Sequence, residues 1–126
     1  MCLGYLKDNN SAYIGSMMGR VANRIGNAEF VLNGKTYQLA KNFLGKHNLH
    51  GGIIGFDKFN WESHVDDKTV YLTHVSKDGY EGFPGTVLVT CECRLNDDNS
   101  FNMKLSAVTD KPTPINMSNH SYFNLA

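Results

Sequence analysis

Apolar and polar residues alternate in short segments along this chain, which is the pattern of half-buried β-strands. The clearest case is the pair Ala28–Leu32 and Lys35–Leu39, which flanks the dipeptide Asn33-Gly34. Because both central residues of a tight two-residue turn need positive φ angles, Asn-Gly between alternating segments predicts a β-hairpin.

A second hairpin is predicted over residues 87–107. Apolar residues occupy every other position from Val87 to Leu95 and from Phe101 to Ala107, and the polar segment Asn96–Asn99 forms the turn between them. Each arm should therefore have one apolar face. Weaker strand patterns cover 13–18, 61–65, 69–75 and 115–125, with a turn at 66–68.

No segment of a dozen residues carries apolar residues at helical spacing, so we expect very little helix. Many short strands separated by turns predict an all-β sandwich or barrel, and 126 residues are enough for one domain, 1–126. Glycine-rich loops lie between the strands at 48–58 and 78–85. Neither loop has the spacing of a phosphate-binding loop.

Composition excludes several classes of protein. The 12 basic and 12 acidic residues balance, so nothing indicates nucleic acid or an anionic membrane surface as a partner. No segment approaches the ~18 apolar residues of a membrane span, and the N-terminus lacks a secretory pattern. Three cysteines, an odd number, argue against a disulfide framework. We expect reduced thiols and a cytoplasmic protein. The sequence does not indicate an oligomeric state.

Two segments near the N-terminus and in the first glycine-rich loop hold candidate ligand-binding residues. Arg20 and Arg24 are either solvated charges or include one guanidinium that binds paired oxygens of a polar ligand. His50 precedes Gly51-Gly52. It is either a surface histidine or one placed where the backbone lets a ligand come close.

His120 lies in the closing segment 113–125, where polar and apolar residues are interleaved. We expect that segment to form a polar pocket on a buried strand. Imidazole titrates near neutral pH, so His120 is a candidate acid–base residue, or else a core histidine bonded by neighbouring Asn or Ser. No G-x-S-x-G elbow indicates a serine nucleophile.

A zinc site could be drawn from two histidines and two cysteines, but the pattern argues against it. Cys91 and Cys93 have C-x-C spacing rather than C-x₂₋₄-C, and both lie on the predicted apolar face of a strand. His47 and His50 lie in a loop. We therefore expect no metal.

Five motifs give the chain a specific resemblance. In order and spacing it resembles the galactose mutarotase (aldose 1-epimerase) family from about Gly15 to its end. The motifs are Gly19-Arg-Val-Ala-Asn-Arg-Ile25; Asn33-Gly-Lys-Thr-Tyr-Gln-Leu39; Leu49-His-Gly-Gly52 with Gly55-Phe-Asp-Lys58 and Trp61; Asp78-Gly-Tyr-Glu-Gly-Phe-Pro-Gly85; and Pro114-Ile-Asn-Met-Ser-Asn-His-Ser-Tyr-Phe-Asn-Leu125.

The resemblance implies a β-sandwich of large antiparallel sheets with a sugar site in a groove across one sheet. The implied reaction interconverts the α and β anomers of free aldohexoses such as galactose and glucose, without a metal or organic cofactor. A glutamate base removes the proton of the anomeric hydroxyl, and a histidine acid protonates the ring oxygen. The implied general acid is His120, and the implied sugar-binding residues are Asn23, Arg24, His50, Ser121 and Tyr122.

The chain also departs from the family's pattern. Members have further strands before the first motif, and their later half supplies a sugar-binding aspartate and the glutamate base. The resemblance therefore implies an incomplete piece that is inactive by itself. A short non-catalytic carbohydrate-binding or interaction module of the same fold is the alternative. An epimerase of phosphorylated hexoses is less favoured, because no added basic cluster is present.

Overall fold

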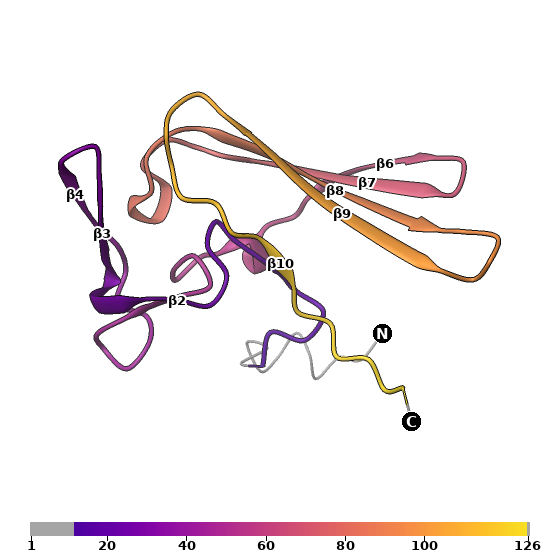
Figure 1. Cartoon of the computed structure of the whole chain (residues 1–126), viewed down its shortest axis with the longest axis horizontal. Helices are drawn as coiled ribbons and strands as arrows, with labels where there is room; N and C mark the ends of the chain where they lie inside the picture. The colour runs from indigo at the N-terminus through magenta and orange to yellow at the C-terminus, as the bar shows by residue number, and fades with distance from the viewer. Residues whose placement is uncertain (1–11, 126) are drawn as a thin grey trace.

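The computed structural model describes residues 12–125 and is built from short antiparallel strands (Figure 1). Its largest element is a four-stranded sheet in which neighbours in the chain are also neighbours in space. The predicted second hairpin and the weaker strands around 61–75 are confirmed in this sheet. Its strands are β6 (Glu62–Asp66), β7 (Thr69–Ser76), β8 (Val87–Leu95) and β9 (Phe101–Thr109).

Three two-stranded ladders accompany this sheet, and the Asn-Gly hairpin is one of them. Asn33 and Gly34 have φ angles of 51° and 76°, as the tight turn requires, so the predicted hairpin is confirmed. The pairs are β1 (Met17–Met18) with β10 (Ser118–Asn119), β2 (Arg24–Ile25) with β5 (Asn48–Leu49), and β3 (Glu29–Leu32) with β4 (Lys35–Gln38).

Helix content is low, as predicted. The described residues hold three 3₁₀ turns of three residues each and no α-helix. They are η1 (Gly26–Ala28), η2 (Phe56–Lys58) and η3 (Tyr80–Gly82).

Two predicted strands are much shorter than expected. In segment 13–18, Tyr13 and Gly15 take positive φ angles and form a turn, so only Met17–Met18 pair. In segment 115–125, only Ser118–Asn119 pair, and the side chain of Asn119 accepts a hydrogen bond from the Ser121 N–H directly afterwards. The prediction of a buried closing strand is therefore wrong. That segment turns outward after His120, and residues 121–125 are exposed.

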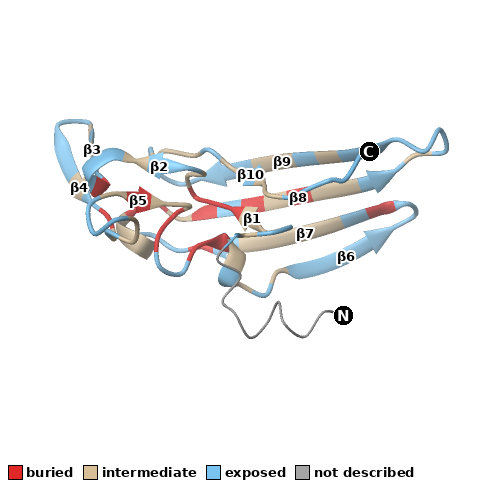
Figure 2. Ribbon diagram, turned by 90° about the horizontal axis from the view of Figure 1, so that it is seen from below, coloured by how far each residue is buried: buried red, intermediate tan, exposed pale blue. Residues whose placement is uncertain are grey.

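The core lies where β1 and β10 cross the inner face of the large sheet (Figure 2). Val87, Val89 and Cys91 alternate along β8 and are fully buried, which confirms the predicted apolar face. Phe56 and Trp61 pack against the same face. A second cluster, beside the β3–β4 hairpin, joins Ala28, Leu39 and Phe83 to Val21, Ile25 and Phe30.

The apolar face of the sheet extends beyond the segments that cover it. At the far ends of the two long hairpins, side chains on this face are exposed, and most of the strand residues there are pale in Figure 2, apart from the buried Thr69 at the start of β7. The described part of the chain thus buries only the inner half of this face. The exposed residues are Val65, Val70, Leu95 and Phe101.

Arg20 joins three distant segments of the chain. Its side chain is 2% exposed, although a solvated charge was one of the two expectations for it. The guanidinium donates to the carbonyl oxygens of Ser76, Lys77 and Pro84 at 2.9, 2.8 and 2.7 Å. It also donates to the hydroxyl groups of Ser76 and Thr113, at 3.1 and 3.3 Å. Arg20 is therefore a structural residue, and its guanidinium has no N–H group left to bind paired oxygens of a ligand.

Arg20→Lys should strongly destabilise the fold. A lysine ammonium has three N–H donors, whereas the Arg20 guanidinium donates five hydrogen bonds, so buried acceptors would lose their donors. We expect the free energy of unfolding to fall by about 3 kcal/mol or more. Arg94→Lys, at an exposed arginine, is the matched control and should change it by less than about 0.5 kcal/mol. Urea unfolding measures both. Equal effects would show that Arg20 has no special structural role.

Candidate functional site

The β2–β5 ladder brings Asn23 and His50 together, although they are far apart in sequence. The His50 N–H donates to the Asn23 carbonyl oxygen at 2.9 Å, and the Asn23 N–H donates to His50 Nδ1 at 3.0 Å. Both residues have positive φ angles, 62° and 52°, a conformation that costs about 1–3 kcal/mol for residues other than glycine. The surrounding contacts therefore hold this pair in a strained, fixed arrangement.

The bond from Asn23 also sets the tautomer of His50. Since Nδ1 accepts a hydrogen bond, the neutral ring carries its proton on Nε2. Burial lowers the pKa of His50, and the neighbouring His120 and Arg24 lower it further, while Asp57 raises it. A neutral imidazole of this kind can donate Nε2–H to a ligand oxygen.

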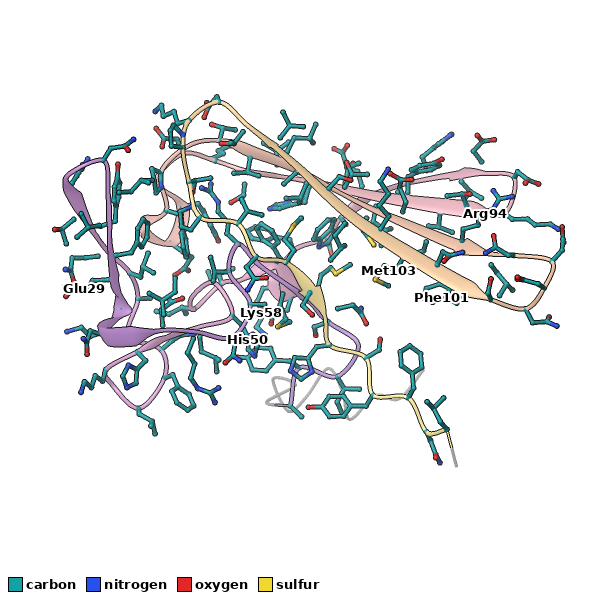
Figure 3. The ribbon with its side chains drawn as sticks, viewed as in Figure 1. Glu29, His50, Lys58, Arg94, Phe101 and Met103 are labelled. Carbon is teal, nitrogen blue, oxygen red and sulfur yellow. The ribbon has the colours of Figure 1, made fainter. Side chains whose placement is uncertain are left out.

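The β1–β10 ladder places His120 beside His50. The Gly15 N–H donates to the His120 carbonyl oxygen, and the His120 N–H donates to the Ser16 carbonyl oxygen. The two imidazole rings then meet edge to face, with centroids 5.4 Å apart. The ring of Tyr13 completes the cluster, 4.7 Å from His50 and 6.2 Å from His120. In Figure 3, His50 lies near the centre of the view, close to Lys58.

Arg24 borders this cluster and is positioned from two sides. Its Nη1 donates to Asn23 Oδ1 at 2.8 Å, and its guanidinium lies 4.3 Å from the ring centroid of Phe43. Arg24 remains exposed, unlike Arg20. Of the two arginines that the sequence singled out, only Arg24 therefore offers donors at the surface beside the histidines.

Ser121 and Tyr122 lie at the outer rim of the site. Both are exposed, and the Tyr122 ring is 5.2 Å from the His120 ring. The Tyr122 hydroxyl donates to the Ala12 carbonyl oxygen at 3.4 Å. The structure thus brings His50, His120, Asn23, Arg24 and Tyr122 into one neighbourhood, with Ser121 at its edge.

Tyr13 and Lys58 belong to the same neighbourhood, and the sequence reasoning did not select them. The ammonium of Lys58 lies 5.7 Å from the Tyr13 ring centroid and pairs with the carboxylate of Asp57. No local spacing marks either residue, because a turn carries Tyr13 and a 3₁₀ element carries Lys58 into this neighbourhood from different parts of the chain.

The glycine pair after His50 has a structural explanation that differs from the expected approach of a ligand. A Cβ on Gly51 would overlap the carbonyl group of Gly19, and a Cβ on Gly52 would overlap the carboxylate of Glu81. That carboxylate accepts hydrogen bonds from the Ile53 and Ile54 N–H groups, at 3.1 and 2.9 Å. The two glycines therefore let the loop pack closely on the rest of the chain, which positions His50.

The residues of the discarded zinc set do not meet. His47 Nδ1 accepts from the Asn27 N–H, His50 Nδ1 accepts from the Asn23 N–H, and the two cysteines lie on β8. Between residues 12 and 125, no group of three His, Cys, Asp or Glu side chains could hold a metal ion. Over the same residues, no helix is long and apolar enough to cross a membrane.

Two neighbouring imidazoles, an arginine and aromatic rings on an all-β scaffold are typical of proteins that bind small polar molecules. The family model described as aldose 1-epimerase matches residues 2–126, so the chain belongs to the aldose 1-epimerase family.

Named relatives agree with this assignment. The aldose 1-epimerase of Escherichia coli K12 is 42% identical over 118 residues, which are 93% of this chain and 34% of that protein. The galactose mutarotase of Bos taurus is 45% identical over 123 residues, which are 98% of this chain and 35% of that protein. The chain thus spans about a third of the length of these relatives.

Solved structures show the same relation. A GalM/aldose epimerase homologue from C. elegans matches with a TM-score of 0.87 and 32% identity, over 99% of this chain and 38% of that one. Galactose 1-epimerase from Lactobacillus acidophilus NCFM matches with a TM-score of 0.85, 32% identity and the same coverage. The strands of this chain therefore form part of the family's β-sandwich.

Gly51→Ala should test the packing of the His50 loop. The left-handed conformation costs an alanine about 1–2 kcal/mol, and overlap with Gly19 adds about 1–3 kcal/mol. Gly34→Ala is the matched control, because Gly34 also has a positive φ but no neighbouring atom within 4 Å. Urea unfolding should show a clearly larger loss for Gly51→Ala. Equal losses would mean that the loop accommodates a Cβ.

Stability should decrease on acidification below about pH 6.5, the ordinary pKa of histidine. Burial lowers the pKa values of His50 and His74 in the fold, so near pH 6 the unfolded chain binds more protons than the folded chain. The stability that the two neutral imidazoles contribute is fully present above the unfolded-state pKa. It is lost as the pH falls from there towards the lowered folded-state pKa values.

Urea unfolding between pH 5 and 8 measures this dependence. His74 packs among Phe56, Phe59 and Trp61, and its buried Nε2 has no hydrogen-bond partner in the described chain. His74→Phe should therefore reduce the slope, by at most about 1.4 kcal/mol per pH unit. His64→Phe, on the exposed strand β6, is the control. An unchanged slope in His74→Phe would contradict the prediction.

Proposed function

We propose that this chain carries the acid-bearing part of a mutarotase, which interconverts the α and β anomers of free aldohexoses such as galactose and glucose. Membership of the aldose 1-epimerase family and the relatives named galactose mutarotase support this proposal. The observation that carries it is the contact between His50 and His120, which joins two distant motifs at one surface.

His120 is the general acid in this proposal. It gives a proton to the ring oxygen while a base takes the proton of the anomeric hydroxyl, and the bond between C1 and the ring oxygen breaks. The open aldehyde rotates about C1–C2 and closes on its other face, with both proton transfers reversed. Imidazole suits this role, because it exchanges protons readily near neutral pH.

The remaining site residues would hold the sugar. The Arg24 guanidinium and the His50 Nε2–H are donors for hydroxyl oxygens, and Asn23 fixes both through its own bonds to them. The exposed ring of Tyr122 and the hydroxyl of Ser121 extend the polar surface beside His120. We propose no metal and no organic cofactor, because this chemistry needs only proton transfer.

The glutamate base lies outside these 126 residues in this proposal. Among nearby acids, Asp57 pairs with Lys58, and Glu81 holds the loop through the Ile53 and Ile54 N–H groups. Since a positioned base contributes about 10²–10⁴-fold, the chain alone should be inactive. The free thiols of Cys91 and Cys93 support a reducing compartment such as the cytoplasm.

Polarimetry with freshly dissolved α-galactose tests the activity. The 126-residue chain should leave the rate of equilibration unchanged. A chimera that adds to this chain the N-terminal and C-terminal parts that it lacks, taken from the E. coli aldose 1-epimerase, should accelerate it. In that chimera, His120→Ala should lower kcat about 10²–10⁴-fold. His64→Ala, remote from the site, should not. An unchanged kcat in His120→Ala would refute the role of His120.

Galactose binding separates the enzyme from the alternative module. In the 126-residue chain, NMR titration with galactose should shift the ring signals of His50 and His120 and leave those of His64 unchanged. Binding with an inactive chimera would favour a non-catalytic carbohydrate-binding module. Shifts with galactose 1-phosphate but not with galactose would favour an epimerase of phosphorylated hexoses.

A further inference from the structure

Four sulfur-containing side chains line one cavity of about 380 Å³ between the large sheet and the β1–β10 ladder. Two are the thiols of Cys91 and Cys93 on β8, one is Met103 on β9, and one is Met17 on β1. Figure 3 shows Met103 beneath β9, on the side towards β10, with further sulfur atoms nearby. We call these four residues the sulfur cluster.

The two thiols are close enough for one ion to bind both. Residues two apart on a strand share a face, and the Sγ atoms of Cys91 and Cys93 lie 3.4 Å apart. A metal ion at a typical sulfur distance of about 2.3 Å from each would span this gap. Both thiols are free in the structure.

Met103 is placed to complete the ligand set. It lies directly opposite Cys93 in the register of β8 and β9, where Cβ atoms are about 4.5–5.5 Å apart. Its flexible side chain can therefore bring a thioether to the thiol pair. Met17 reaches the same cavity from the opposite wall, which β1 forms.

Thiolate and thioether ligands without histidine or carboxylate partners favour a soft monovalent ion. We propose that the sulfur cluster binds one Cu(I) ion, with the thiolates of Cys91 and Cys93 and the thioether of Met103 as ligands. In this step Cu⁺ and two thiols give an anionic dithiolate complex and two protons, with no change in oxidation state.

Zinc fits the sulfur cluster poorly. Structural zinc sites take four nitrogen, thiolate or oxygen ligands, and among residues 12–125 no third His, Cys, Asp or Glu joins the cysteine pair. Thioethers, in contrast, are ordinary ligands of Cu(I). Selectivity for Cu(I) over Zn²⁺ is therefore part of the proposal.

The charged groups near the sulfur cluster are paired with other side chains. Glu92 on β8 pairs with Lys104, and Asp57 in the cavity wall pairs with Lys58.

The test uses the 126-residue protein with Cys2→Ser, which removes the third cysteine. Anaerobic Cu(I) titration against the chromophoric chelator bicinchoninate at pH 7.5 should give one bound ion per chain, and Zn²⁺ should not compete. Cys91→Ala and Cys93→Ala should each abolish binding. Met103→Leu should weaken it about tenfold. Met18→Leu, at a buried methionine outside the cavity, should not.

Several results would overturn the proposal: Cu(I) binding only when Cys2 is present, undiminished binding in Cys93→Ala or Met103→Leu, or equal affinity for Zn²⁺. Circular dichroism checks that each variant folds. If Cys91→Ala does not fold, the half-buried positions Cys93 and Met103 decide the outcome. Galactose binding at His50 and His120 should survive these substitutions, so failure here is separable from failure of the proposed sugar site.

Discussion

The buried guanidinium of Arg20 is the interaction on which the rest of the fold depends. Its donors serve carbonyl and hydroxyl groups from the end of β7, the second glycine-rich loop and the entry to the closing segment. The Arg20 carbonyl oxygen also accepts from the Asn116 N–H, and the neighbouring Gly19 fits against Gly51. A charge this deep costs several kcal/mol in desolvation, which saturated hydrogen bonding offsets. The same few residues thus connect the sheet, both loops and the closing segment that carries His120.

The site residues owe their positions to backbone conformations that are individually unfavourable. Asn23 and His50 both take the left-handed conformation, and they bond to each other through backbone and ring. Glu81, itself at a φ of 50°, holds the loop that follows His50. Such conformations persist only where several surrounding contacts together fix them, and they concentrate at functional sites. The imidazole of His50 is consequently fixed in orientation and tautomer before any ligand arrives.

Local patterns predicted the hairpins well, because alternation and the Asn-Gly turn act within a few residues. They predicted neither the buried state of Arg20 nor the short ladders that join Arg24 to Leu49 and Met17 to Asn119, since such contacts depend on the whole chain. The closing segment looked like a long strand because its apolar residues alternate, yet it pairs for only two residues. Tyr13 had no distinguishing spacing. The order of the motifs predicted which residues belong to the site. Only the structure showed how those residues are arranged.

The β1–β10 ladder has a consequence for the order of folding. It pairs Met17 with Asn119, which closes a loop of about a hundred residues, whereas the hairpins close loops of a few residues. Contacts of such long sequence separation form late, after local pairings have paid part of the entropy of ordering the chain. During synthesis, His50 leaves the ribosome well before His120 does. The two imidazoles therefore cannot meet until the chain has been synthesised past His120.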